Sequence, residues 1–432
     1  MTETLFAPGY KAEPFWWEAS PRPAKTEVDL PASADVVVIG SGFTGLHAAI
    51  QTARGGRQTV VLDAEAAGWG CSSRNGGQVS TSIKPGYDAL ARRFGAETAF
   101  GLLREGHEAL EWIGDFIAEE GLDCAFRRVG RFYAAHTPQS YDVLARAQAA
   151  PIKGLETGSF MVQKAEQGAE IDSDLYHGGV VHPQHASVDP GRYHLGLLAK
   201  AQAAGAEIVS HCKAGAITGA PGALVVETAR GQISARNVIV ATSGYTGPAT
   251  PWHRRRIIPI GSYMLATEPL PAGMVERLIP KDRVLTDTRR LVVYYRSCPE
   301  RRRILFGGRV SISETDATAV APALHAEMVR IFPALAETRM SHAWMGFVGY
   351  TFDEMPHLGA REGVHYAMGY CGSGVSLSSY LGMKIGLQVL GRSEGDSPLS
   401  RIPFETRPYY WGKPWFLAPS VAYYRWRDRR AA

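Results

Sequence analysis

Cysteine is scarce in this sequence, and long apolar runs are missing. The five cysteines include no C-x-x-C pair, and their number is odd. This argues against a disulfide framework or a zinc ribbon and favours a reducing compartment. No window approaches the roughly 18 apolar residues of a membrane span, and the start lacks the basic and apolar regions of a signal peptide. We therefore expect a cytoplasmic protein without a membrane span.

An excess of one charge is also missing. The chain has 46 Lys+Arg against 42 Asp+Glu, a formal net charge of +4 over 432 residues, which does not indicate a nucleic-acid partner. Neither a Ser-His-Asp set nor H-E-x-x-H is recognisable, and His182 and His185 lack the carboxylates of a metal site, so no metal is predicted. The length predicts two or three lobes in an ordinary globular chain.

The stretch VVVIGSGFTG reads as a strand, a glycine turn and the start of a helix. Gly40, Gly42 and Gly45 fit G-x-G-x-x-G, in which the glycines allow a tight turn, close approach of a pyrophosphate and close helix packing. Asp63 ends the next strand, where a carboxylate can accept ribose hydroxyls and would repel the 2′-phosphate of NADP. The pattern predicts an NAD or FAD site; a βαβ unit without a ligand is the plainer alternative.

The segment after Asp63, GWGCSSRNGGQ, favours FAD, because small residues there can wrap a longer dinucleotide; a solvated loop is the alternative. Here the chain resembles the D-amino-acid-oxidase-like (DAO) FAD oxidoreductases, which include sarcosine, glycine and γ-glutamylputrescine oxidases. The motifs IGSGFTGLHAA, VVLDAE, GCSSRNGG, NVIVATSGYTG, ATEPL, AWMGF, TFDEMPHLG and GYCGSGVSLSS occur in that family's order over about residues 35–390. The γ-glutamylputrescine-oxidase-like branch is the most similar.

The resemblance implies a two-lobed α/β (α+β) fold with a Rossmann-like FAD-binding domain and an interleaved antiparallel β-sheet substrate domain. We assign 35–85, 150–250 and 345–395 to the FAD-binding domain. The substrate domain then comprises 86–149 and 251–344. An N-terminal arm (1–34) and a C-terminal tail (396–432) complete the chain.

The resemblance also implies that FAD lies between distant parts of the sequence. Adenosine and pyrophosphate would contact the first glycine turn and Asp63, and the isoalloxazine would lie against 73–77 and the late turn 369–376. The last helix would point its positive end at the flavin. The predicted cofactor-binding residues are Gly40, Gly42, Phe43, Thr44, Gly45, Asp63, Ala64, Gly70, Cys71, Ser72, Ser73, Arg74, Asn75, Gly76, Gly77, Ala214, Gly244, Gly346, Gly372, Ser373, Gly374, Val375 and Ser376.

Substrate contacts should come from the β-rich segments that face flavin in the family. The predicted catalytic residues are Tyr263, Tyr294, Arg309, His182, Arg296 and Trp344. Each has a plainer interpretation, since aromatic residues on strands usually belong to the core. Because side chains alternate along a strand, at most one of Tyr294 and Tyr295 can face the pocket.

These features predict hydride transfer from the carbon beside an amine nitrogen to the flavin, followed by hydrolysis of the imine. Arginines around VVYYR favour a carboxylate-bearing secondary amine, such as sarcosine or iminodiacetate, over a cationic polyamine. The alternatives are a γ-glutamylputrescine-type polyamine oxidase, a D-amino-acid dehydrogenase, a tRNA-modifying flavoprotein and an NAD-dependent dehydrogenase.

The sequence departs from the family at three points. The segment 282–383 contains no lysine to activate oxygen, so the electron acceptor is either O2 or an electron-transfer partner. Ser373 stands where many relatives have histidine. Cys71 and Cys371 both fall in loops near the flavin, where a covalent cysteinyl link is one interpretation and simple packing is the favoured one.

Overall fold

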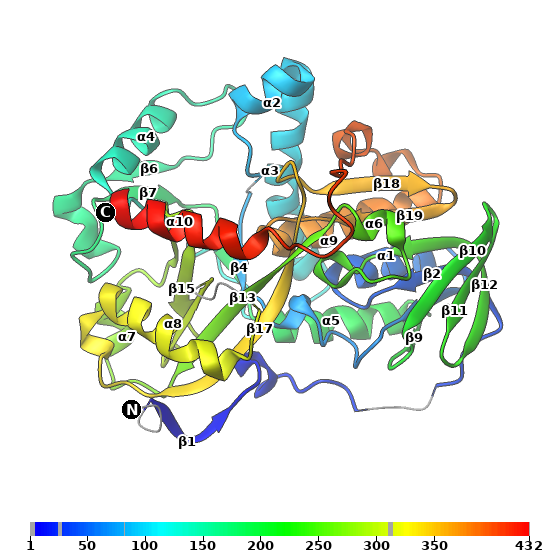
Figure 1. The fold of residues 1–432 in the computed structure, drawn as a ribbon, viewed down its shortest axis with the longest axis horizontal. Helices are drawn as coiled ribbons and strands as arrows, with labels where there is room; N and C mark the ends of the chain where they lie inside the picture. Colours follow the sequence, from blue (N-terminus) through cyan, green and yellow to red (C-terminus); the bar gives the residue numbers. More distant parts are fainter. Residues whose placement is uncertain (1–4, 25–27, 82, 310–313, 432) are drawn as a thin grey trace.

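The computed structural model describes residues 5–24, 28–81, 83–309 and 314–431. Two large β-sheets, here called sheet A and sheet B, form two lobes that lie side by side in Figure 1. Sheet A lies in the lobe at the left of that view, and sheet B lies in the lobe at the right. The α/β, two-lobed fold class predicted from the sequence is confirmed.

Sheet B has a parallel core in which every neighbour is distant in sequence. β12 pairs in parallel with both β2 and β19, and β2 pairs in parallel with β3. Both faces of β2 are buried: Val36 and Val38 pack on one side, and Val37 and Ile39 on the other. The strands of sheet B are β2 (Ser33–Ile39), β3 (Thr59–Leu62), β9 (Glu207–Val209), β10 (Ala214–Ala220), β11 (Ala223–Thr228), β12 (Gly231–Val240), β18 (His357–Arg361) and β19 (Val364–Met368).

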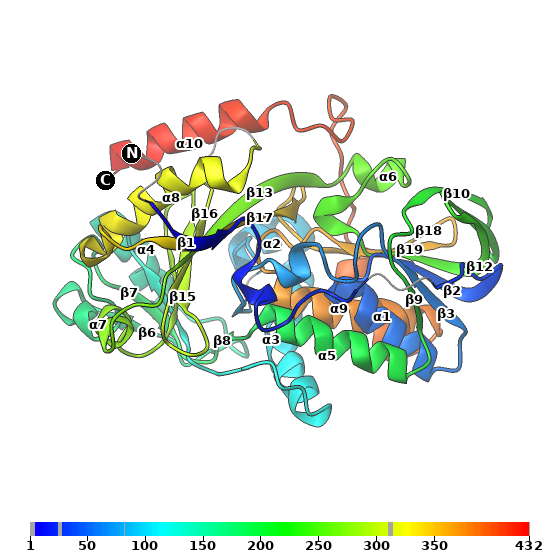
Figure 2. The same cartoon turned by 90° about the horizontal axis from the view of Figure 1, so that it is seen from below.

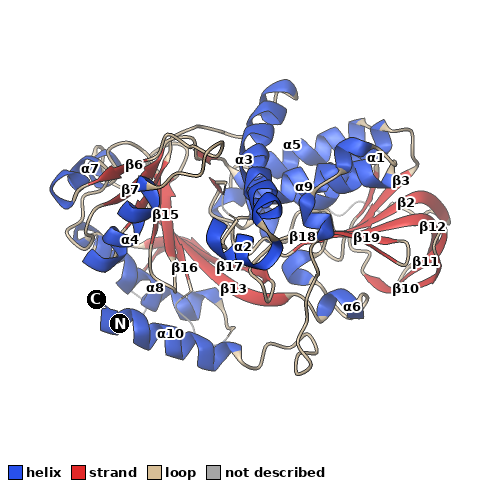
Figure 3. Ribbon diagram, turned by 90° about the horizontal axis from the view of Figure 1, so that it is seen from above, coloured by secondary structure: helices blue, strands red, loops and turns tan. Residues whose placement is uncertain are grey.

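Helices α1 (Phe43–Arg54), α3 (Ala96–Glu119), α5 (Pro190–Ala203) and α9 (Gly374–Val389) gather beside sheet B, as Figure 3 shows. α1 ends at Gly55, as the glycine pair predicts. α1 and α9 touch through glycine, because a Cβ on Gly382 would lie 2.5 Å from the carbonyl oxygen of Thr44. The two helices that follow the glycine turns are therefore packed directly together.

Sheet A is a mixed sheet with two unlike faces. One face packs under helices α7 (Met274–Leu278) and α8 (Ala317–Ile331) in a core that includes Phe132, Tyr295 and Phe306. The other face turns toward sheet B. The strands of sheet A, in spatial order, are β1 (Phe6–Lys11), β17 (Met340–Tyr350), β13 (Ile258–Thr267), β16 (Ile304–Gly308), β15 (Val293–Ser297), β14 (Val284–Asp287), β5 (Arg131–Ala134), β7 (Gly179–His182) and β6 (Phe160–Val162).

The remaining elements are short or peripheral. β4 (Gln78–Val79) and β8 (Ala186–Ser187) form a two-stranded ladder. The other helices are α2 (Tyr87–Phe94), α4 (Pro138–Ala149), α6 (Pro251–Arg254) and α10 (Leu417–Ala431). Figures 1 and 2 show α10 beside the lobe that contains sheet A. No helix in the described ranges is both long and apolar enough to cross a bilayer.

The structure differs from the predicted domain boundaries in three places. β6 and β7, assigned to the FAD-binding domain, extend sheet A because β7 pairs with β5. α2 and α3, assigned to the substrate domain, contribute Leu90, Leu102 and Leu110 to the core between the helices and sheet B. The N-terminal arm contains a strand, β1, beside β17. These pairings join segments that local sequence patterns cannot relate.

Candidate active site and cofactor cavity

A cavity of about 1770 Å³ lies between the two lobes, and most of the predicted site residues line it. Pockets for one small ligand usually span roughly 300–1,000 Å³, so this cavity has room for a dinucleotide and a substrate. Among the predicted residues, those that line it are Gly40, Gly42, Phe43, Thr44, Asp63, Ala64, Gly70, Cys71, Ser72, Arg74, Asn75, Gly76, Ala214, Gly244, Gly346, Gly372, Ser373, Gly374, Val375, His182, Tyr294 and Arg309.

The first glycine turn leaves the N-terminus of α1 open to the cavity. Gly40 has φ +104°, and no side chain caps the helix at Gly42. Gly45 does not line the cavity; a Cβ there would lie 1.8 Å from the carbonyl oxygen of Gly40, so its role is close packing. An uncapped helix N-terminus offers free N–H groups and a partial positive charge to a diphosphate.

Asp63 lies at the end of β3 beside this turn. Its Oδ2 accepts a hydrogen bond from the backbone N–H of Ser41 at 2.9 Å, and its Oδ1 accepts one from Glu65 at 3.0 Å. Burial raises the pKa of Asp63 above its ordinary value, although these hydrogen bonds oppose the change. The carboxyl group is thus held in one orientation at the cavity wall, as the ribose-binding prediction requires.

The N-terminal arm holds the GCSSRNGG loop in place. Trp16 Nε1 donates to the carbonyl of Asn75 at 2.8 Å, and Trp17 Nε1 donates to Ser73 Oγ at 2.9 Å. The guanidinium of Arg74 lies 4.7 Å from the centre of the Trp17 ring. Ser73 is therefore buried under the arm and does not line the cavity. The sequence signal for this support was the aromatic triplet FWW, which carried no role in the sequence analysis.

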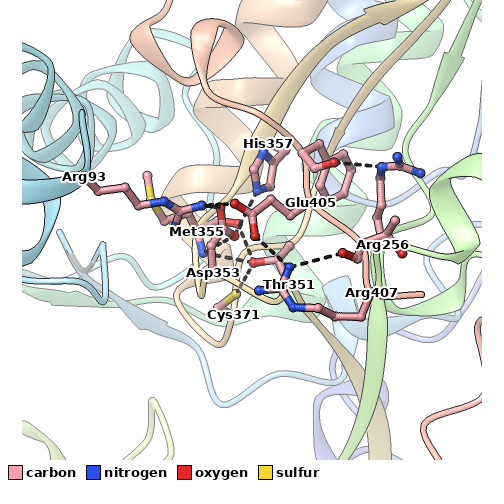
Figure 4. Close-up of polar contacts among 11 residues, drawn as sticks. Arg93, Arg256, Thr351, Asp353, Met355, His357, Cys371, Glu405 and Arg407 are labelled. Carbon is pink, nitrogen blue, oxygen red and sulfur yellow. Dashed lines mark hydrogen bonds and ion pairs between the residues drawn. The ribbon is translucent and has the colours of Figure 1, made fainter. Parts of the chain in front are cut away.

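The late glycine turn rests on a polar network, shown in Figure 4. The N–H of Cys371 donates to the carbonyl of Gly349 at 3.0 Å, and Thr351 Oγ1 lies 3.5 Å from Cys371 Sγ. Asp353 accepts from His357 Nε2 at 3.1 Å. Burial alone would raise the pKa of Asp353, but the hydrogen bond and charge of His357 lower it below its ordinary value. The TFDEMPHLG motif thus supports the turn from outside the cavity.

α9 begins at this turn with the geometry that the first turn also has. Its N-terminal residue Ser373 makes no side-chain cap, so the first N–H groups of α9 face the cavity that Gly374 and Val375 line. Ser376 Oγ donates to the carbonyl of Ser80 at 2.6 Å and holds the helix against the segment that follows the GCSSRNGG loop. Ser376 therefore lies behind the cavity wall.

Both cysteines of the flavin-proximal loops line the cavity. Burial raises the pKa of the Cys71 thiol to about 11 and that of the Cys371 thiol to about 11. Both sulfurs are therefore protonated at neutral pH, whereas a thiolate is the nucleophile needed for covalent attachment. This supports the interpretation of both cysteines as small packing residues.

Alternation along sheet A decides which tyrosines reach the cavity. Tyr294 lines it, and its hydroxyl lies 2.9 Å from Ser262 Oγ, whereas Tyr295 is buried in the core under α8. Tyr263 also points into that core, where its hydroxyl donates to the carbonyl of Thr315 at 3.2 Å. The predicted substrate contact of Tyr263 is therefore corrected, because its strand position places it on the opposite face of the sheet.

Trp344 and Arg296 are also displaced from their predicted role. Trp344 Nε1 donates to the carbonyl of Arg74 at 2.8 Å, and its ring packs against Trp16 behind the loop. Arg296 Nη1 donates to the carbonyls of Gly77 and Val188 at 2.9 and 2.8 Å. Neither side chain lines the cavity. Both instead join the loop and the arm to sheet A, and Gly77 is held in this contact too.

Arg296→Leu is expected to lower the free energy of unfolding by at least about 3 kcal/mol, because it leaves the carbonyls of Gly77, Val188 and Ser297 without their buried donor. Urea unfolding of both proteins measures this. Arg296→Lys, which keeps the charge but not the fork of donors, should lie between them. Unchanged unfolding combined with a raised KM would instead return Arg296 to the substrate site.

His182 and Arg309 reach the cavity from opposite sides of sheet A. Burial, followed by the charge of Arg131, lowers the pKa of His182 to about 3, so its imidazole is neutral. Arg309 donates to the carbonyl of Gly261 at 2.7 Å and forms an ion pair with Glu314 at 3.0 Å. The Arg309 guanidinium therefore already has a counter-ion.

Lys84 places a cation in the cavity that the sequence analysis missed. Its Nζ donates to the hydroxyl of Tyr350 at 2.6 Å, on the side of the cavity where Cys371 lies. The search for an oxygen-activating lysine covered only 282–383, and the segment around residue 84 showed no pattern that connects it to the late turn. Only the fold brings the two together.

The chain belongs to the FAD-dependent oxidoreductase (DAO) family, whose model matches residues 35–386. It is therefore an FAD-dependent oxidoreductase, and the predictions of family and cofactor are confirmed, whereas the NAD-dependent alternative is not supported. The open N-termini of α1 and α9, the glycine packing and Asp63 suit such a dinucleotide.

The chain is 30% identical to gamma-glutamylputrescine oxidoreductase of Escherichia coli K12, over 92% of this chain and 93% of the relative. It is also 30% identical to the probable oxidoreductase OrdL of Rhizobium meliloti, over 99% of both chains. Glycine oxidase from Geobacillus kaustophilus has a similar fold, with a TM-score of 0.73 at 16% identity, covering 88% of this chain and all of that one (100%).

Proposed function

We propose that this enzyme oxidises the C–N bond of a small, carboxylate-bearing secondary amine, an N-substituted glycine such as sarcosine or iminodiacetate. The observation that carries the proposal is the charge of the cavity wall. Among the described residues of sheet A that line the cavity, Asp287 is the one carboxylate, and Arg289 pairs with it at 2.6 Å. A cationic polyamine tail finds no free acid there, whereas an anion meets arginines.

The residues of sheet A suit an amine that must lose its proton. Bound FAD supplies the two-electron acceptor for the oxidation of the C–N bond. Burial raises the pKa of Tyr294 well above its ordinary value, and His182 is neutral, so the wall offers hydrogen bonds without a charge beside the amine. A low-polarity wall disfavours the ammonium form, which cannot release hydride. Water then hydrolyses the imine to an amine and glyoxylate or another aldehyde.

The relative from E. coli supports a second candidate, oxidation of a γ-glutamyl polyamine conjugate. Such a conjugate carries both a carboxylate and an amine, so the arginines suit one of its ends. The similarity of fold to glycine oxidase and to iminodiacetate oxidase from Chelativorans sp. BNC1 is compatible with either substrate. In both cases the final electron acceptor is O2 or an electron-transfer partner.

Anaerobic mixing of the holoenzyme with a substrate panel tests the proposal. The panel contains N-methyl and N-carboxymethyl glycines, D-amino acids and γ-glutamyl polyamines, and loss of the flavin band near ~450 nm is measured. We expect the N-substituted glycines to bleach the flavin fastest. Bleaching by the polyamine conjugates alone would contradict the proposal and favour the second candidate.

A further inference from the structure

Arg131 is a cation without a counter-ion in the cavity wall. It begins β5, in the part of sheet A that β7 extends, and its side chain lines the cavity. Its Nε is buried without a hydrogen-bond partner, and no ion pair joins its guanidinium to any residue that the structure describes. Burial lowers the pKa of Arg131 to about 10, so it stays charged at neutral pH. An unpaired buried cation is costly.

The other arginines of the wall differ from Arg131 in this respect. Arg309 forms its ion pair with Glu314. Arg289 is held between Asp287 at 2.6 Å and Glu327 at 2.9 Å. A bound anion would have to compete with these carboxylates, but it would meet no such competition at Arg131.

The neighbours of Arg131 share its face of sheet A. Arg131 stands opposite His182 in the ladder between β5 and β7, and Tyr133 lies two residues further along β5. The guanidinium carbon of Arg131 lies 5.4 Å from the centre of the Tyr133 ring. The His182 and His185 rings stack at 4.9 Å, and burial keeps the pKa of each below its ordinary value. Both therefore offer neutral N–H donors.

Two further polar atoms in this part of the wall lack partners. Thr286 on β14 stands opposite Tyr133, and its buried Oγ1 has no hydrogen bond. His185 Nδ1 is likewise buried and unpartnered. Both residues line the cavity. Because buried polar groups in folded proteins are nearly always satisfied, a cation and two neutral groups left open in one region point to a ligand that accepts hydrogen bonds.

We propose that Arg131, with Thr286 and the stacked pair His182 and His185, forms the subsite that binds the carboxylate of the substrate. This rests on the proposed oxidation of an N-substituted glycine and identifies the residue that selects it. Arg131 sets specificity by charge: an acid-bearing amine gains an ion pair, and an amine of the same size without the acid leaves the cation desolvated and alone. Arg309, with its own counter-ion, then has a secondary role.

Calorimetric titration of the holoenzyme with thiodiacetate tests the subsite without turnover, because sulfur replaces the oxidisable amine. Arg131→Met should weaken binding about 10- to 100-fold, the loss expected for one charge-assisted contact. Thr286→Val, which keeps the side-chain shape, should weaken it about two- to tenfold. Arg131→Lys should restore part of the affinity. Arg236→Met, which removes an exposed arginine of β12, is the matched control and should bind like the wild type.

The outcomes separate this inference from the proposed function. Equal affinity in Arg131→Met and wild type, no detectable binding of millimolar thiodiacetate to wild type, or a loss confined to Arg309→Met would each overturn it. If Arg131→Met loses thiodiacetate binding but N-substituted glycines fail to bleach the flavin, the subsite stands and the reaction is wrong. If they bleach the flavin while Arg131→Met binds normally, the reaction stands and the subsite is wrong.

Discussion

Gly45→Ala is expected to yield protein that purifies without flavin. The added methyl group would lie 1.8 Å from the carbonyl oxygen of Gly40 and 3.2 Å from Val38 Cγ1, so either the glycine turn or the whole of α1 must move. Displacement of the first turn removes the N–H groups that face the diphosphate. The ratio of flavin to protein absorbance after purification measures the effect.

Gly168→Ala is the matched control, because no atom lies within 4 Å of the added Cβ and the residue is not in the left-handed region. It should retain a full complement of flavin. Asp63→Asn tests the same site with less disturbance of the fold, and its affinity for FAD should fall by about 10-fold or more, the value of a charge-assisted contact. If Gly45→Ala keeps wild-type flavin content and unfolding, the role given to the turn is incorrect.

Acidification from pH 7.5 to pH 5 is expected to destabilise the protein by several kcal/mol. Burial lowers the pKa values of His47, His194 and His253 to about 3 each. Because the unfolded chain binds protons near pH 6.5 and the folded chain does not, stability is full above that pH. It falls as the pH drops from 6.5 toward 3, by about 1.4 kcal/mol per pH unit for each histidine.

Urea unfolding at a series of pH values measures this loss. His47 stands between Tyr193, whose hydroxyl lies 2.9 Å from its Nε2, and the rings of Trp112 and Phe116. His47→Gln removes one titrating group, so the slope of stability against pH should become shallower by about 1.4 kcal/mol per unit below pH 6.5. A wild-type profile that stays flat between pH 7 and pH 5 would show that these imidazoles are not buried.

Local patterns predicted the elements that hold the cofactor, because each is continuous in sequence. The strand, glycine turn and helix from Val36 to Arg54 depend on short-range spacing, and so does the turn that begins α9. Which face of sheet A a residue occupies depends on partners elsewhere in the chain. Tyr263 and Tyr294 looked equivalent in sequence, and only the pairing of β13 with β16 and β17 places the first in the core.

Arg131 shows why the anionic subsite was missed. In sequence it is one arginine of the FRRVGRFYAAH stretch, which reads as an ordinary strand. Its interest lies in the lack of a carboxylate around it, and that depends on β7, β14 and the helices that close the cavity. Arg309 was favoured because two glycines precede it, yet the structure gives it Glu314 as a partner. Counter-ions belong to the tertiary arrangement.

The packing of α1 against α9 also affects how the protein is made. Synthesis delivers α1 to the solvent early, but the helix that touches it through Gly382 emerges from the ribosome only after most of the chain. Until then the nascent protein can form neither half of the cofactor cradle in its final position. Flavin capture is therefore a late event, and a shortage of riboflavin would leave full-length but incompletely consolidated chains exposed to proteases.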